Sequence, residues 1–132
     1  MDIPVYGFDV TGFTEDDLLK CSKSIQQIKE LAEKARREGL LALEDDLSSL
    51  DSFFLQQGVQ LVCNGDEPDI IRAILMRLIA SGGYTGVELL KRIILMEGVL
   101  GIQAGDNPRV LQTSLHAFLG EEMMKRLEAE NS

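Results

Sequence analysis

The segment that follows Pro68 constrains the fold more than any other part of the chain. From Ile70 to Ile79, large apolar residues recur at spacings of three and four, which place them on one face of an α-helix. Asp66 is the expected N-cap, and Pro68 stands just inside the helix, where proline is tolerated best. The apolar residues are Ile70, Ile71, Ile74, Leu75, Leu78 and Ile79. Such a face must be buried against other elements, so the segment predicts one member of a packed helical domain.

The same period recurs along most of the chain. Aromatic residues make up only 5% of the sequence, so a core of Leu, Ile, Val and Met is expected, which favours helices over a sandwich or barrel. The segment 87–104 is the most apolar and is expected at the centre of the core. Further helices are predicted over residues 14–38, 40–50, 53–62 and from 106 onward, with Thr14 as an N-cap and a break at Gly39. We therefore predict an all-α, compact single-domain helical bundle of five or six helices.

Composition changes set the expected boundaries. Residues 1–13 predict an irregular N-terminal arm with a short extended piece at 5–10, and residues 14–120 form the helical domain. Residues 121–132 are polar and predict a C-terminal helix end or tail. The glycine-rich segment 81–86 is expected to be a flexible turn between two helices.

The charge balance excludes several classes of partner. With 22 acidic and 13 basic residues, the net charge of −9 opposes binding to nucleic acids and to anionic membranes. No apolar run approaches the ~18 residues of a membrane span, and the start of the chain lacks the pattern of a signal peptide. We expect a soluble, cytoplasmic protein with no direct membrane insertion, in which Cys21 and Cys63 are reduced thiols.

Few residues suggest catalysis. His116 is the only histidine, and its apolar neighbours indicate a residue on the side of a helix. The segment 82–86 lacks the Gly-Lys-Ser/Thr ending of a phosphate-binding loop. No catalytic, cofactor-binding or metal-ligating residues are predicted, and the protein is expected to be no enzyme.

In the segment from Lys34 to Glu44, side chains of both charges directly flank a run of five apolar residues, 39–43. Judged from the residues alone, the simpler interpretation is a solvated helix face, a break at Gly39 and a core helix. This segment also resembles the Ala-Arg-Arg-Glu-Gly-Leu-Leu-Ala-Leu-Glu motif of the MotA family, the stator subunit of the flagellar motor. The resemblance continues in order through residues 53–65, the Pro-Asp-Ile-Ile-Arg helix at 67–75, and the segment 97–110.

The resemblance covers roughly residues 25–119 and implies a stator-like cytoplasmic domain without its membrane helices. The family has two membrane helices before the first motif and two between the helix at 67–75 and the signature at 97–110. Here residues 1–13 stand in place of the first pair and the join at 81–86 in place of the second. Because the family's ion path lies in the membrane helices, this chain is expected to conduct no ions.

The resemblance also implies a binding site. Charged residues of the family's motif engage the rotor switch protein FliG, and by position they correspond to Arg36 and Glu44, with Arg37 and Asp45 beside them. If the helix continued through Gly39, Arg36 and Glu44 would lie about 12 Å apart on a similar side. Alternatively, Glu44 caps or braces the helix that follows Gly39. The function expected is a protein-binding module of the flagellar motor, located at its inner face, with FliG-like rotor proteins or full-length stator subunits as partners. A general helical adaptor with other partners is the alternative.

Overall fold

The computed structural model describes residues 9–131 and contains no β-strand in that range, which confirms the all-α class. The α-helices are α1 (Glu15–Glu38), α2 (Phe53–Cys63), α3 (Pro68–Gly82), α4 (Gly86–Ala104), α5 (Pro108–His116) and α6 (Glu121–Glu130). The 3-10 segments are η1 (Val10–Gly12), η2 (Leu40–Ser49) and η3 (Ala117–Leu119). Most of the extended piece expected at 5–10 lies outside the described residues.

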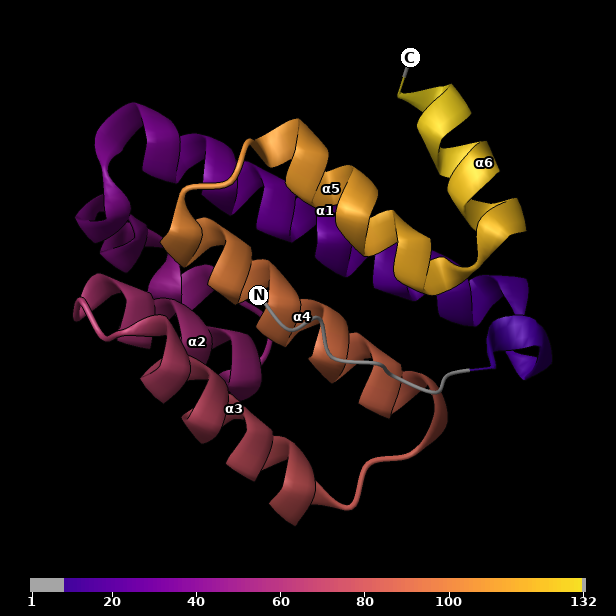
Figure 1. The fold of residues 1–132 in the computed structure, drawn as a ribbon, viewed down its shortest axis with the longest axis horizontal. Coiled ribbons are helices and arrows are strands. Elements are labelled where there is room, and N and C mark those ends of the chain that lie inside the picture. Colours follow the sequence, from indigo (N-terminus) through magenta and orange to yellow (C-terminus); the bar gives the residue numbers. More distant parts are fainter. Residues whose placement is uncertain (1–8, 132) are drawn as a thin grey trace.

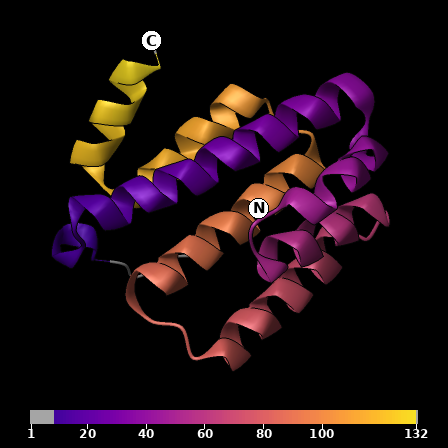
Figure 2. The same ribbon diagram turned by 180° about the vertical axis from the view of Figure 1, so that it is seen from behind.

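The helices α1 and α4 pack along each other through the middle of the molecule (Figure 1). The pair α2 and α3 covers one side of α4, and α5 packs against α1 and α4 on the other side (Figure 2). Nine residues of α4 are buried, more than in any other helix described, as expected for the most apolar segment of the chain. The core of the domain therefore lies around α4.

The start of α1 is fixed by its own sequence. The Thr14 hydroxyl accepts a hydrogen bond from the Asp17 backbone N–H, and the Asp17 carboxylate accepts one from the Thr14 N–H. This reciprocal capping satisfies two amide groups that the first helical turn leaves unpaired. The predicted N-cap at Thr14 is confirmed.

The start of α3 corrects one expectation. Its N-cap is Glu67 and not Asp66, and the cap makes no side-chain hydrogen bond. Pro68 is the first helical residue, so the cap position falls on the residue directly before it. The Asp66 N–H instead donates to the Leu61 carbonyl and closes the end of α2.

The connection between α3 and α4 consists of residues 83–85 only. Gly83 has a φ of 66°, in the left-handed region that favours glycine. The Tyr84 ring lies so close to Gly82 that a Cβ there would stand 2.0 Å from a ring carbon. The Arg92 guanidinium carbon lies 3.5 Å from the centre of the same ring. The turn is thus shorter and better packed than a flexible linker.

An insertion of eight Gly/Ser residues after Gly83 is expected to lower the free energy of unfolding by no more than about 2 kcal/mol. The closure entropy of a loop grows slowly with its length, and the stacking of Arg92 on Tyr84 contributes about 1 kcal/mol at most. Thermal melting measures the change, and the same insertion between Ile94 and Leu95, both buried in α4, is the destructive control. Equal damage from the two insertions would contradict the expectation.

The polar end of the chain forms a helix of its own, α6, after a turn at Gly120 with a φ of 92°. Met123 and Leu127 are its buried residues, and it packs beside α5 and η3. The Arg126 guanidinium lies 2.8 Å from Glu15 Oε1 at the start of α1. Two buried side chains at a spacing of four are enough to dock the segment, which is why so polar a sequence is helical here.

Candidate functional site

The chain reverses direction at Gly39, between the end of α1 and η2. The φ of Gly39 is 93°, and its N–H donates to the Ala35 carbonyl at 2.8 Å to close the helix. A residue with a Cβ is strained in this conformation. The predicted break at Gly39 is confirmed, and the 12 Å spacing of Arg36 and Glu44, which required a continuous helix, does not apply.

The segment after the turn, η2, is a 3-10 helix of ten residues, although 3-10 runs longer than three or four residues are uncommon. Leu43 is fully buried and is the only buried residue of η2, with Leu40 and Leu47 partly buried beside it. Side chains three residues apart lie one above the other in such a helix. Leu41, 67% exposed, and the exposed Glu44 therefore share one face.

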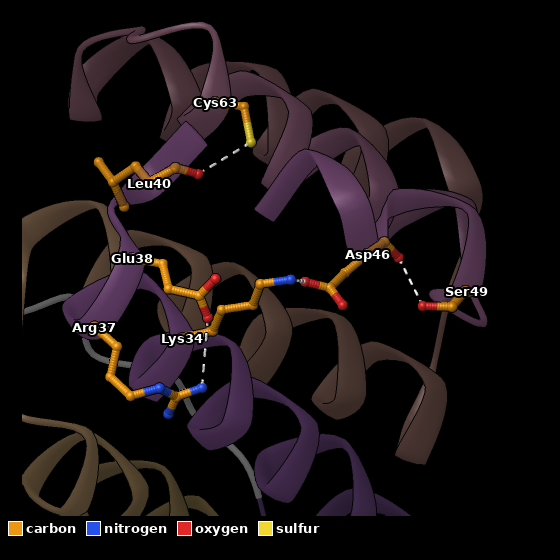
Figure 3. A network of polar contacts seen from close by, with 7 residues as sticks. All are labelled: Lys34, Arg37, Glu38, Leu40, Asp46, Ser49 and Cys63. Atoms are coloured by element: carbon orange, nitrogen blue, oxygen red, sulfur yellow. Dashed lines mark hydrogen bonds and ion pairs between the residues drawn. The ribbon is translucent and has the colours of Figure 1, made fainter. Parts of the chain in front are cut away.

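An ion pair holds η2 against α1, as Figure 3 shows. The Lys34 Nζ lies 2.9 Å from Asp46 Oδ2, and the two side chains are only 22% and 32% exposed. The hydrogen bond that Lys34 donates to the Asp46 carboxylate raises the pKa of Lys34, and the negative charges of Asp45 and Glu38 add to the effect. The Cys63 thiol of α2 lies 3.5 Å from the Leu40 carbonyl and links the start of η2 to α2. The turn is therefore braced from two sides.

All four predicted binding residues are exposed around this turn. Arg36 and Arg37 occupy the last turn of α1, where positive charge suits the negative end of the helix dipole. Arg37 lies 3.7 Å from Glu38, an exposed pair of little energetic weight. Burial, together with the negative charge of Glu44, raises the pKa of Cys63, and the negative charge of Asp45 contributes to raising the pKa of Lys34.

The alternative interpretation of Glu44 was that it caps or braces the helix after Gly39. In the structure, Asp46 is the residue that braces this segment. No ion pair or side-chain hydrogen bond of Glu44 occurs among residues 9–131, whereas Asp46 pairs with Lys34 across the turn. Sequence reasoning missed both members of this pair. They are twelve positions apart, and only the reversal at Gly39 brings them together.

His116 lies on the buried side of α5, as expected, and is 2% exposed. Its Nδ1 lies 2.9 Å from Glu128 Oε2 of α6, and the Thr113 hydroxyl donates to the other oxygen of Glu128. The bond from Thr113, followed by that from His116, lowers the pKa of Glu128. The cluster joins α5 to α6.

Cys21 and Cys63 are free and buried, and burial raises the pKa of Cys21 to about 11. Across residues 9–131, no three His, Cys, Asp or Glu side chains gather as metal ligands.

The described part of the chain holds no helix that is both long and apolar enough to cross a membrane. The chain matches no protein-family model. It is 26% identical to motility protein A of Borreliella burgdorferi, over 72% of this chain and 65% of the relative. It is also 26% identical to motility protein A of Treponema pallidum, over 80% of this chain and 69% of the relative.

A shorter match reaches higher identity. Motility protein A of Bacillus subtilis is 38% identical over 63 residues, which are 48% of this chain and 23% of the relative. The chain thus spans less than two thirds of the Borreliella and Bacillus proteins. The Borreliella alignment runs over 168 positions, more than the 132 residues of this chain, so that relative has a long stretch without a counterpart here. The chain is thus similar, over most of its length, to several motility A proteins.

Proposed function

We propose that this chain is a protein-binding module of the bacterial flagellar motor. It contacts a rotor or stator component through the exposed charges on either side of Gly39. The observation that supports this most is the placement of Arg36, Arg37, Glu44 and Asp45, all exposed, around a turn that Lys34 and Asp46 brace. The leading partner is a FliG-like rotor switch protein, because the matching charges of the family's motif engage it; full-length stator subunits are the second.

Electrostatics supports this kind of contact. Charges at an interface steer the encounter and select the partner more than they add affinity. The partly buried pair of Lys34 and Asp46 fixes η2, so the neighbouring exposed charges are presented at constant positions. Because this surface carries both positive and negative side chains, it favours a partner surface that carries charges of the opposite sign at the matching positions.

The proposal assigns no ion path to this chain and places it on the cytoplasmic side of the motor. In the family, the ion path belongs to membrane helices, two of which lie between the segments that correspond to α3 and α4. In this chain, residues 83–85 alone join α3 to α4. The long unmatched stretch in the Borreliella alignment supports the same interpretation. What remains is two halves of a cytoplasmic domain packed directly through α1 and α4.

Reversing one charge tests the contact. Arg36→Glu and Glu44→Lys are each expected to weaken binding to the rotor switch protein of the same organism about tenfold, because an attraction becomes a repulsion. The free energy of unfolding should change by less than about 0.5 kcal/mol, as for other exposed positions. Binding isotherms at low and physiological salt, with a melt of each variant, measure both quantities; the affinity should fall as salt screens the charges beyond about 8 Å.

Lys125→Glu and Glu122→Lys on α6 are the matched controls, since they make the same changes of net charge at exposed positions. Equal losses in the controls would mean that only net charge matters. An unchanged affinity with a lowered melting temperature for Glu44→Lys would leave this residue a structural role alone.

A general helical adaptor that keeps this fold and binds other partners is the second candidate. The same charged turn would then serve a different surface. Purification of the chain from its own cells separates the two, because motor proteins co-purify only in the first case.

A further inference from the structure

The segment η2 keeps a 3-10 pattern over ten residues, which its own hydrogen bonds explain poorly. Such long runs are uncommon, because 3-10 hydrogen bonds have poorer geometry than those of an α-helix. At the start of η2, the Ala42 nitrogen lies 3.2 Å from the Gly39 carbonyl oxygen, and at its end the Leu50 nitrogen lies 3.3 Å from the Leu47 carbonyl oxygen. Both distances exceed the usual value of about 2.9–3.0 Å. Contacts with the rest of the domain must therefore hold η2 in this form.

The leucines of η2 do not decide between the two helical forms. Leu40, Leu43, Leu47 and Leu50 stand three or four positions apart, and an α-helix would also gather them on one face. The α-helix would in addition form the better backbone hydrogen bonds. An α-helical η2 is therefore the nearest competitor of the observed 3-10 form.

The ion pair of Lys34 and Asp46 distinguishes the two forms. In a 3-10 helix, residues three apart lie one above the other, so Asp46 lies in line with the buried Leu43. This position brings its Oδ2 to 2.9 Å from the Lys34 Nζ on α1, as Figure 3 shows. In an α-helix with Leu43 fixed, Asp46 would turn away by about 60° and shift along the axis by about 1.5 Å. The pair therefore stabilises the 3-10 form and not its competitor.

The two forms also differ in length. Ten residues span about 20 Å in a 3-10 helix and about 15 Å in an α-helix. The connection between η2 and the buried part of α2 makes up the difference, because Asp51 is exposed and Phe53 is 64% exposed. Neither side chain belongs to the core, so this connection straightens without unpacking α2. The fold thus allows both forms.

We propose that η2 is a two-state element in which the pair of Lys34 and Asp46 holds the 3-10 form, and that breaking the pair converts the segment into an α-helix. The conversion releases both charged side chains and turns Asp45 relative to Leu43 by about 40°. It also draws the ends of η2 about 5 Å closer together. The charged turn thus presents a different arrangement in each form. The inference concerns this chain alone and does not depend on the identity of a partner.

Two substitutions that remove the pair without changing helix propensity test the inference. Lys34→Met and Asp46→Asn each exchange residues of nearly equal propensity. Nuclear Overhauser effects of the full chain report the form of η2: contacts from an Hα to the amide two residues later mark a 3-10 helix, and contacts to the amide four residues later mark an α-helix. We expect the first kind over residues 41–48 in the parent and the second kind in both variants. Asp45→Asn is the matched control, because it makes the same substitution at the exposed neighbouring position, and it should keep the parent contacts.

Restoring the pair in reverse completes the test. Lys34→Glu combined with Asp46→Lys is expected to return η2 to the 3-10 contacts, which a loss of packing alone would not do. Parent contacts in both single variants would overturn the inference, because the pair would then not select the form. Contacts of an α-helix in the Asp45→Asn control would also overturn it, since the loss of any negative charge would then be enough. The absence of both kinds of contact in a folded variant would show that η2 has no second helical form. If one single variant fails to fold, the other and the reversed pair decide.

Discussion

Gly98→Leu is expected to lower the melting temperature by about 10 °C or more. In the middle of α4, Gly98 lets α1 approach so closely that a Cβ would stand 2.9 Å from three carbons of the Ile28 side chain. Ile28 is fully buried and β-branched, so it has little freedom to move aside. Overpacking of this kind costs about 3 kcal/mol, well above the ~1 kcal/mol by which leucine improves helix propensity. Each kcal/mol corresponds to about 4 °C for a domain of this size.

Ala104→Leu supplies the matched comparison, because it adds a leucine to an exposed position of the same helix. It should shift the free energy of unfolding by less than about 0.5 kcal/mol. Calorimetry or circular dichroism measures both variants. A Gly98→Leu variant as stable as its control would mean that α1 and α4 do not pack as closely as described, and the direct joining of the two halves would lose its main support.

The sequence predicted the helices well where their apolar period is unambiguous. In α1 most of the buried residues recur at spacings of three and four, whereas α4 is buried on several sides. Both helices occupy the expected ranges to within about one residue. The exception within a helix is Ile70, which belongs to the predicted apolar face of α3 but is 51% exposed. It lies in the first turn of α3, whereas the buried residues Ile71, Leu75 and Ile79 follow it. Periodicity gives the face of a helix, whereas burial also depends on what lies opposite.

The segment η2 shows where periodicity stops being informative. Leu40, Leu43, Leu47 and Leu50 have spacings of three, four and three, which suit an α-helix and a 3-10 helix equally. The choice depends on how the chain leaves Gly39 and docks on α1 and α2, and this is tertiary information. The exposed charges Arg36, Arg37, Glu44 and Asp45 could be found from the family motif. Their bracing pair, Lys34 and Asp46, could not, since it forms only when segments apart in the sequence meet.

Leu43→Ala is expected to destabilise the domain by about 2–5 kcal/mol and to weaken partner binding as well. Leu43 has no exposed surface and is the single buried residue that η2 contributes to the core. Its truncation removes apolar contacts and leaves a cavity that the surrounding helices fill only in part. The loss corresponds to a fall in melting temperature of roughly 10–20 °C.

The binding effect has a separate cause. Glu44 and Asp45 follow Leu43 directly, and once Leu43 no longer anchors η2, the pair of Lys34 and Asp46 and the contact of Cys63 with Leu40 hold this segment less firmly. A binding site that must be ordered on association has a lower affinity, because the ordering reduces the free energy gained. The affinity for the rotor switch protein should therefore fall even at temperatures well below the melting transition of the variant.

Leu41→Ala is the control, since it makes the same substitution two residues away at an exposed position. It should leave the melting temperature within about 2 °C of the parent, because exposed substitutions change the free energy of unfolding by less than about 0.5 kcal/mol. Hydrogen exchange of the η2 amides at 20 °C distinguishes the two effects of Leu43→Ala. We expect faster hydrogen exchange that is confined to the η2 amides, together with a lower affinity for the partner. This result would show that the domain remains folded while η2 is no longer held against the core. A destabilised variant that binds as tightly as the parent would show that the site does not depend on the docking of η2.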